Sequence, residues 1–264
     1  MPSTSGHKER TSRNARLQPS RYDPVLTAPV LTLDVDWASD AVIDAVAGLL
    51  VERRVRSTWF VTHESQAVDR LRARPDLFEL GIHPNMLPGS THGSSESEVL
   101  THMRTILPGA TVMRTHGLYQ TANFLAKAAL DFGITIDASL YLPHSSHLQA
   151  HCLRTGGARL WRVPYFWEDD DEMFEDEPIW TASDPRIAGP GLRVFDFHPV
   201  HVALNTGRFE RYDELRRARP PREWDTAFID AHVSSGPGPG TIFVELVESL
   251  AGRGRFVSEL ADIR

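Results

Sequence analysis

The chain has 264 residues, of which 41% are hydrophobic and 24% are charged, which fits one α/β domain with a sizeable buried core. The formal net charge of −7 argues against a nucleic-acid partner, because proteins that bind a phosphate backbone normally carry a basic face. The single cysteine, Cys152, excludes an internal disulfide and fits a reducing compartment, and no apolar run reaches the length of a membrane span. We therefore expect a soluble cytoplasmic protein.

The chain order of patterns predicts an α/β fold. Residues 1–22 are polar and basic and are expected to form a disordered tail, followed by a single domain over 23–264. Strand and helix patterns then alternate, which predicts parallel βαβ units in a barrel or an open sheet. Strands are expected at 29–37, 56–62, 77–83, 111–117 and 135–140, and helices at 39–54, 65–76, 95–108 and 120–134.

The second half is less regular. Strand patterns cover 159–167 and 192–203, and a final helix is expected from about Thr241, after the turn "SSGPGPG". The acidic run "WEDDDEMFEDE" at 167–177 is typical of a solvated loop.

Two aspartates end the first strand pattern. In "LTLDVDW", Asp34 and Asp36 are separated by one residue, so on a strand both carboxylates point to the same face. Two such carboxylates repel each other unless a cation lies beside them, which predicts a metal site. The alternatives are that one of them caps the next helix or is simply exposed at a strand end.

An Asp-x-Asp pair after a strand also occurs in phosphatases that use an aspartate nucleophile and in glycosyltransferases. Both classes need cationic help for phosphates, usually including a lysine. The chain has only two lysines, Lys8 and Lys127, and shows no glycine-rich phosphate loop. These absences weaken the prediction of a phosphate-handling enzyme, which we keep as an alternative.

Three histidines share one local pattern. His83, His116 and His198 each end an apolar or β-branched run, and each is followed by proline or glycine. A single histidine of this kind is usually structural, but parallel strands bring their carboxyl ends to one rim, where three can converge with an aspartate pair. One carboxylate and two imidazoles suit zinc or a similar divalent ion.

Five motifs carry a family resemblance. "LTLDVDW", "STWFVTH", "ELGIHPN", "VMRTHG" and "VFDFHP" occur in the order found in the polysaccharide deacetylase family, which has NodB homology and is similar to carbohydrate esterase family 4. The likeness extends from about Val30 to the C-terminus, and the "HPN" and "R-x-H" patterns resemble the divergent WbmS-like branch. The resemblance implies a distorted (β/α)7 barrel of NodB-homology type.

The resemblance also implies catalytic roles. Asp34 corresponds to the general base, His198 to the general acid and Arg114 to the arginine that orients the base. Asp196, two residues before His198 on the same predicted strand face, is a candidate for raising the pKa of that histidine.

For the metal, the resemblance implies Asp36 and His83 as ligands. The family's second motif usually supplies another histidine four residues after the first, but Leu87 stands there in this chain. We therefore predict His116 as the replacement ligand. The expected cofactor is one divalent ion, zinc first, with nickel, cobalt, manganese and iron as other candidates.

Four further residues are predicted to line the substrate pocket. Trp167 and Asp169 stand where the family keeps an aromatic wall and an acid that orients the histidine; the alternative is a surface loop with one core tryptophan. Trp37 and Asn85 follow directly on metal-site motifs.

Together these patterns predict a metal-dependent hydrolase that removes an N-acyl group, acetyl first, from an amino sugar, a glycan precursor or a sugar-containing metabolite. Its expected partner is that substrate, with no nucleic acid and no membrane span. A catalytically inactive carbohydrate-binding barrel is the second alternative.

Overall fold

The computed structural model describes residues 28–261, so the tail predicted at 1–22 lies outside the described residues. Within this range the core of the fold is one nine-stranded sheet in the order β6-β7-β5-β4-β3-β2-β1-β9-β8. All neighbouring strands are parallel except β6 and β7. The strands are β1 (Pro29–Asp34), β2 (Ser57–Val61), β3 (Phe78–Ile82), β4 (Val112–Met113), β5 (Ile136–Asp137), β6 (His151–Thr155), β7 (Ala158–Arg162), β8 (Trp167–Glu168) and β9 (Arg193–Phe197).

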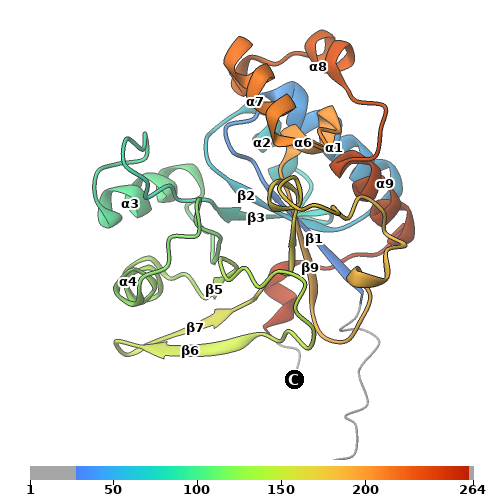
Figure 1. Cartoon of the computed structure of the whole chain (residues 1–264). Coiled ribbons are helices and arrows are strands. Elements are labelled where there is room, and N and C mark those ends of the chain that lie inside the picture. Colours follow the sequence, from blue (N-terminus) through green and yellow to red (C-terminus); the bar gives the residue numbers. More distant parts are fainter. Residues whose placement is uncertain (1–27, 262–264) are drawn as a thin grey trace, which may run out of the picture.

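Nine α-helices lie in the described range and connect or cover these strands (Figure 1). They are α1 (Asp40–Arg53), α2 (Gln66–Arg72), α3 (Glu96–Ile106), α4 (Ala122–Phe132), α5 (Asp169–Glu172), α6 (Pro199–Leu204), α7 (Phe209–Ala218), α8 (Thr226–His232) and α9 (Pro239–Ser249). Short 3-10 turns occur at Pro185–Ile187, Pro221–Glu223 and Val257–Leu260. Helices α1, α6 and α9 pack against one another on one flank of the sheet, and α4 packs on the β6–β7 hairpin.

The central strands are buried on both faces, which explains their nearly continuous apolar sequence. Every residue of β2 and β9 is buried, as are five of the six residues of β1. The helices start where the sequence offers caps: the side chains of Ser39, Ser65 and Ser95 each accept a hydrogen bond from a backbone N–H in the first turn of the helix that follows.

The sheet curls into a barrel whose remaining gap is bridged by backbone hydrogen bonds. The segment after β5 meets the segment before β8, where Tyr165 N donates to Leu140 O at 3.0 Å and Leu142 N donates to Tyr165 O at 2.9 Å. The predicted α/β fold with a distorted (β/α)7 barrel is thus confirmed. The curl brings the carboxyl ends of the strands to one rim.

Several local predictions were wrong. The strand predicted over 192–203 ends at Phe197, because Pro199 occupies the first turn of α6, a position that suits a residue without a backbone N–H. The final helix, expected from about Thr241, is confirmed and begins at Pro239. The hairpin strand β6 was not predicted, although two consecutive left-handed glycines, Gly156 and Gly157, form its turn.

Candidate active site

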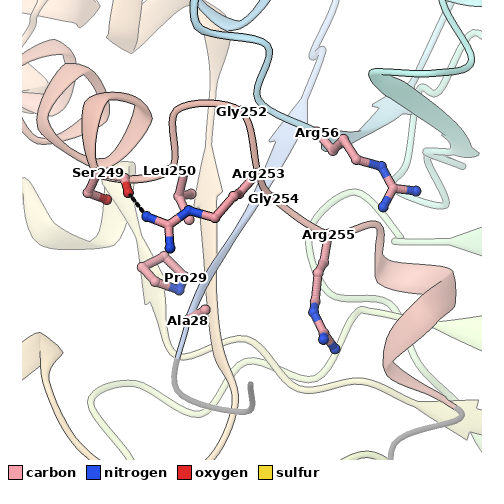
Figure 2. Close-up of a pocket in the computed structure, with 9 residues that line it drawn as sticks. All are labelled: Ala28, Pro29, Arg56, Ser249, Leu250, Gly252, Arg253, Gly254 and Arg255. Atoms are coloured by element: carbon pink, nitrogen blue, oxygen red, sulfur yellow. Dashed lines mark hydrogen bonds between the residues drawn. The ribbon is translucent and has the colours of Figure 1, made fainter. Parts of the chain in front are cut away.

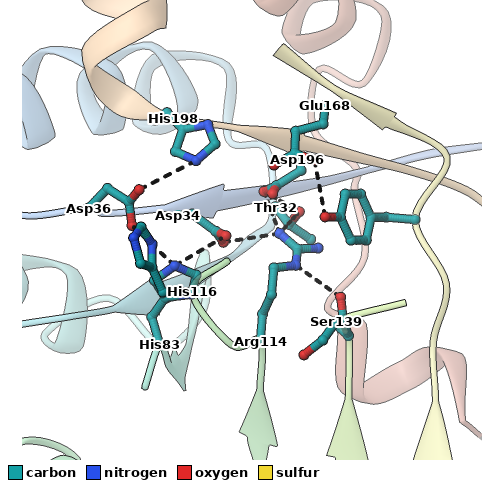
Figure 3. Close-up of polar contacts among 12 residues, drawn as sticks. Thr32, Asp34, Asp36, His83, Arg114, His116, Ser139, Glu168, Asp196 and His198 are labelled. Carbon is teal, nitrogen blue, oxygen red and sulfur yellow. Dashed lines mark hydrogen bonds and ion pairs between the residues drawn. The ribbon is translucent and has the colours of Figure 1, made fainter. Parts of the chain in front are cut away.

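The site lies where β1, β3, β4 and β9 end. His83 follows β3 directly, His198 follows β9 directly, and Arg114 and His116 follow β4 within three residues. The predicted convergence of strand-end histidines is therefore what the structure shows (Figure 3). They surround a cavity of about 290 Å³ lined by Asp34, Asp36, His83, Thr115, His116, Gly117, Leu118, Tyr165, Glu168, Asp170 and His198.

The aspartate pair reaches this cavity in a different way from the one predicted. Strand β1 ends at Asp34, and the backbone then turns through the left-handed region at Asp36 (φ 44°) and Trp37 (φ 56°). Such a conformation is costly for residues other than glycine and is found preferentially at functional sites. The turn directs the Asp36 carboxylate at the histidines while Val35 stays in the core.

Asp36, His83 and His116 form a candidate metal centre, since each offers a ligand atom within 4.8 Å of those of the other two. Asp36 Oδ1 lies 3.1 Å from both His83 Nε2 and His116 Nδ1. His83 is only 1% exposed, yet neither of its ring nitrogens makes a hydrogen bond with the described residues. Its Nε2 faces the carboxylates of Asp36 and Asp34, at 3.1 and 3.5 Å, without hydrogen-bond geometry, an arrangement that fits a metal ligand.

The ionisation of Asp36 also supports a metal centre formed by these three residues. Burial alone would raise the pKa of Asp36, but His116 and His83 more than offset it and hold that pKa well below its usual value of 3.8. Asp36 is therefore a carboxylate, the form that a metal ligand requires. Carboxylate and imidazole donors suit zinc and the other divalent ions named above.

A second group within ligand distance consists of Glu168, Asp170 and His198. It fits a metal less well, because burial and the charge of Asp170 raise the pKa of Glu168 well above its usual value, and the Glu168 carboxyl already accepts a hydrogen bond from Tyr165 at 3.2 Å. The Nδ1 of His198 is also committed, at 2.7 Å from Asp169. We therefore favour the set formed by Asp36, His83 and His116.

Arg114 holds the predicted base. Its Nη1 donates to Asp34 at 3.0 Å, to Thr32 Oγ1 at 2.8 Å and to Asp196, while its Nε donates to Ala138 O at 3.0 Å. Burial alone would lower the pKa of Arg114, but Asp196 and Asp34 more than offset this and raise it. The guanidinium is therefore charged at any working pH and fixes Asp34 in place.

Asp169 holds the predicted acid. Its two carboxylate oxygens accept hydrogen bonds from the backbone N–H and from Nδ1 of His198, at 2.8 and 2.7 Å. Burial alone would lower the pKa of His198, but Asp169, Asp170 and Asp36 more than offset it and raise the pKa well above 6.5. His198 Nε2, the free nitrogen, lies 3.6 Å from Asp36 and can carry a proton toward the cavity.

Asp196 interacts with His198 only through its charge, and its hydrogen bonds go to other residues. Its carboxylate bonds Arg114 and Thr32 and makes no hydrogen bond to His198. Although strand alternation puts Asp196 on the same face as position 198, His198 stands beyond the end of β9, where it begins α6. Asp169 is the residue that contacts the histidine.

The predicted pocket residues fall into two groups, and none of them lines the cavity. Asp169 is fully buried behind His198, and Trp167, also 0% exposed, packs in the core on Phe195 and Phe197. Trp167 is thus a core residue: it precedes Glu168 in β8, and since Glu168 lines the cavity, strand alternation points Trp167 to the opposite face.

Trp37 and Asn85 lie beside His116 rather than in the cavity. The Trp37 ring meets the His116 ring edge-on at 5.3 Å, and Asn85 pairs with His116 through an isolated backbone bridge. His92 supports this arrangement, since its Nδ1 accepts a hydrogen bond from Asn85 N at 3.1 Å and burial lowers its pKa to about 4. These residues can orient His116, and their contact with substrate stays a prediction.

Tyr165, Glu168 and Asp170 line the cavity and were not predicted. The acidic run is predicted as a solvated loop, but its residues Glu168 and Asp170 come directly after the strand pattern "RVPYFW". That strand-end position is the signal that would have placed them at the rim.

A larger cavity, of about 620 Å³, lies at the opposite end of the strands, beside the start of β1 (Figure 2). It is lined by arginine and apolar residues and offers neither a carboxylate nor an imidazole. Its three guanidinium groups, on Arg56, Arg253 and Arg255, point in different directions. It therefore has none of the features of a catalytic centre.

The fold and this site define a class of hydrolase, and comparison with known proteins identifies the family. Residues 31–216 match the family model described as WbmS-like polysaccharide deacetylase. The chain belongs to this polysaccharide deacetylase family, which supports a hydrolase that acts on amide bonds. A comparison with curated proteins found no match.

Among solved structures, the chain is similar to a polysaccharide deacetylase from Bordetella bronchiseptica, WbmS, described as involved in O-antigen biosynthesis. The identity is 30%, with 88% of this chain and 93% of that one covered and a TM-score of 0.74. A 4-alpha-glucanotransferase from Thermococcus litoralis shares 10% identity over 88% of this chain and 37% of its own, with a TM-score of 0.50, which shows a shared fold alone. The peptidoglycan deacetylase PdaC from Bacillus subtilis has 14% identity, coverages of 90% and 91%, and a TM-score of 0.44.

In the part of the chain that the structure covers, no helix has the length and apolar character needed to cross a membrane.

Proposed function

We propose that the chain is a metal-dependent N-deacylase that releases an acyl group, acetyl first, from an amino sugar or glycan precursor. One observation carries the proposal: a base–arginine pair, Asp34 with Arg114, and an acid–carboxylate pair, His198 with Asp169, flank the set of Asp36, His83 and His116. The two pairs give the site one group held to accept a proton and another held to donate one.

The metal ligands would be Asp36, His83 and His116. They fit a divalent ion through their donor types and because the ring nitrogens of the buried His83 make no hydrogen bond with the described residues. When bound, the ion supplies Lewis-acid polarisation of the amide carbonyl and activation of water.

The chain's own residues then move the protons. Asp34, fixed by Arg114, accepts a proton from the attacking water. His198 enters the reaction protonated because Asp169 stabilises its charge, and it gives the Nε2 proton to the leaving nitrogen. The amide C–N bond breaks, and the products are a carboxylate and a free amine.

The substrate class follows from the family and from the WbmS relative, whose described role in O-antigen biosynthesis supports a glycan precursor. A cavity of about 290 Å³ suits an acylamino group and part of one sugar ring rather than a whole polymer segment. The cytoplasmic location expected above remains a prediction and would agree with a precursor as substrate.

The direct test is acetate release from N-acetylated sugars by wild type, by chelator-treated protein and by the same protein reloaded with zinc. We expect release that is lost on chelation and restored by the metal. Asp34→Asn should abolish it, whereas Asp44→Asn, an exposed aspartate paired with Arg70, should leave it unchanged.

Two outcomes would favour the alternatives. Hydrolysis of a phosphate ester that needs Asp34 but survives His83→Ala would favour a phosphate-handling enzyme. Stoichiometric metal binding without release of acyl group from any acylamino sugar would favour an inactive carbohydrate-binding barrel.

A further inference from the structure

A third cavity lies beside the start of α7. It has a volume of about 510 Å³ and lies between the segment after α5 and the connections that follow α6 and α8. Its lining includes Trp180, Asn205, Arg208, Arg211 and Ser234. None of its lining residues is a carboxylate, although the acidic run ends at Glu177, directly before Pro178 in the lining.

The polar groups of this cavity are mainly free donors. Arg208 makes no hydrogen bond or ion pair with the described residues, and Arg211 has only a contact of 3.5 Å to Glu214. Trp180 is only 8% exposed, yet its indole N–H also lacks a partner within residues 28–261. That nitrogen lies beside Gly207, another lining residue. The ring is largely buried, but its nitrogen is not among the buried unpartnered atoms, so the N–H opens into the cavity, where a ligand or water can accept from it.

The cavity wall is rigid. Asn205 Nδ2 donates to Ser234 O at 3.0 Å and to Gly236 O at 2.6 Å, so this side chain ties the end of α6 to the segment after α8. At Gly207, an added Cβ would lie 2.8 Å from Pro237 O, so the two segments pack too closely for another residue. The donors are therefore presented on a preformed surface, which lowers the entropic cost of binding.

Two guanidinium groups and an indole N–H suit an anionic oxygen ligand, and the one carboxylate that contacts them is the exposed Glu214, 3.5 Å from Arg211. The two arginines lie at the start of α7, a ten-residue helix whose N-terminus has no side-chain cap. The helix dipole therefore adds to their attraction for an anion. Two guanidinium groups match the two phosphoryl groups of a diphosphate.

A row of aromatic rings links this cavity to the catalytic acid. Ring centroids are 5.5 Å apart for His198 and His201, 4.5 Å for His201 and Tyr212, and 6.0 Å for Tyr212 and Phe209. Phe209 is the neighbour of Arg208, and it also packs at 5.0 Å on Phe174, whose side chain is 67% exposed. Exposed aromatic rings are suited to contact a sugar or a base.

From this arrangement we propose that the cavity lined by Trp180, Arg208 and Arg211 binds the diphosphate of an activated acylamino sugar whose acyl group occupies the catalytic cavity. The inference rests on the proposed function and names its substrate class. The shared chemistry is a sugar diphosphate ester, which a nucleotide sugar and a lipid-linked sugar both contain.

The first test measures binding alone, by calorimetric titration of inorganic pyrophosphate into the protein in a phosphate-free buffer. Arg208→Ala/Arg211→Ala should weaken binding about tenfold or more, and Trp180→Phe should weaken it less. The matched control is Arg217→Ala, an exposed arginine on the same helix outside the cavity lining, which should bind as wild type does. His116→Ala should also bind normally, which separates this site from the metal centre.

The second test compares acetate release from free N-acetylglucosamine, from its uridine diphosphate ester and from its polyprenyl diphosphate ester. We expect the double arginine variant to raise KM about tenfold or more for the diphosphates and to leave the free sugar unchanged. The ester with the higher kcat/KM identifies the source of the diphosphate. Equal kcat/KM for the free sugar and both esters would overturn the proposal.

The two tests separate this inference from the proposed function. If pyrophosphate binds through Arg208 and Arg211 but no acylamino sugar is hydrolysed, the anion site stands and the deacylase proposal fails. If wild type does not bind pyrophosphate, or if the double variant binds it equally well, the anion site is refuted even where acetate is released.

Discussion

Replacing Arg114 with methionine tests whether the base is held by a buried, shared cation. Arg114 is 1% exposed and contacts Asp34, 4% exposed, and Asp196, 0% exposed. The substitution keeps much of the side-chain volume but leaves two buried carboxylates without their cation. Removing one partner from a buried ion pair typically costs about 3–5 kcal/mol, and we expect a loss of that size in the free energy of unfolding.

The loss should depend on pH. Burial already raises the pKa of Asp196 well above 3.8 although Arg114 opposes it, so removal of Arg114 should raise that pKa further. A carboxyl whose pKa is higher in the folded state than in the unfolded state destabilises the fold as the pH rises above the unfolded value. Arg114→Met should therefore be more destabilised, relative to wild type, at pH 8 than at pH 5.

Denaturation by urea at both pH values measures these effects, and a second variant isolates the charge pair. Arg114→Met/Asp196→Asn should recover about 1 kcal/mol or more of the loss, because only Asp34 then lacks its cation. A loss below about 1 kcal/mol for Arg114→Met, or equal losses at pH 5 and pH 8, would refute the reasoning.

Three further predictions concern the acid, the core and a buried carboxyl. Asp169→Asn should lower the pKa of His198, so that kcat of the metal-loaded enzyme falls at a lower pH on the alkaline side; an unchanged alkaline limb would contradict this. Trp167→Ala should cost about 3–5 kcal/mol in urea denaturation without changing bound metal, and metal loss from a still folded variant would show that Trp167 supports the site. Glu172 is 1% exposed and burial raises its pKa from 4.5 to about 7, so wild type should lose stability as the pH rises across that interval. The free energy of unfolding of Glu172→Gln, relative to wild type, should increase by about 1–3 kcal/mol from pH 5 to pH 8. A difference between the two proteins that is the same at both pH values would refute the raised pKa of Glu172.

The sequence was sufficient to locate the catalytic rim because strand ends carry local signals. His83 and His198 each precede a proline that cannot continue a strand ladder, and parallel topology brings such positions together. The predicted ligands and the two predicted proton-transfer residues therefore meet in one cavity.

What the sequence could not supply were contacts between distant segments. The bond from Arg114 to Asp196 joins residues whose proximity depends on how the barrel closes, and no local pattern signalled the left-handed turn at Asp36. The bond between Asp169 and His198 was implied only by the family resemblance. Trp167 and Tyr165 are two residues apart in one aromatic run, but only Tyr165 faces the cavity. The cavity with Arg208 and Arg211 has no motif at all, because its wall comes from three separate segments.

The most direct measurement is the metal content per chain, by plasma mass spectrometry, after loading with zinc and removal of free ion. The account predicts about one ion per chain in wild type, in Leu87→Ala and in Asp170→Asn, and loss of the ion in His83→Ala and His116→Ala. Retention in His116→Ala together with loss in Asp170→Asn would place the ion at the group of Glu168, Asp170 and His198 and contradict the proposed ligands. A wild type that cannot be loaded would contradict the metal-dependent mechanism itself.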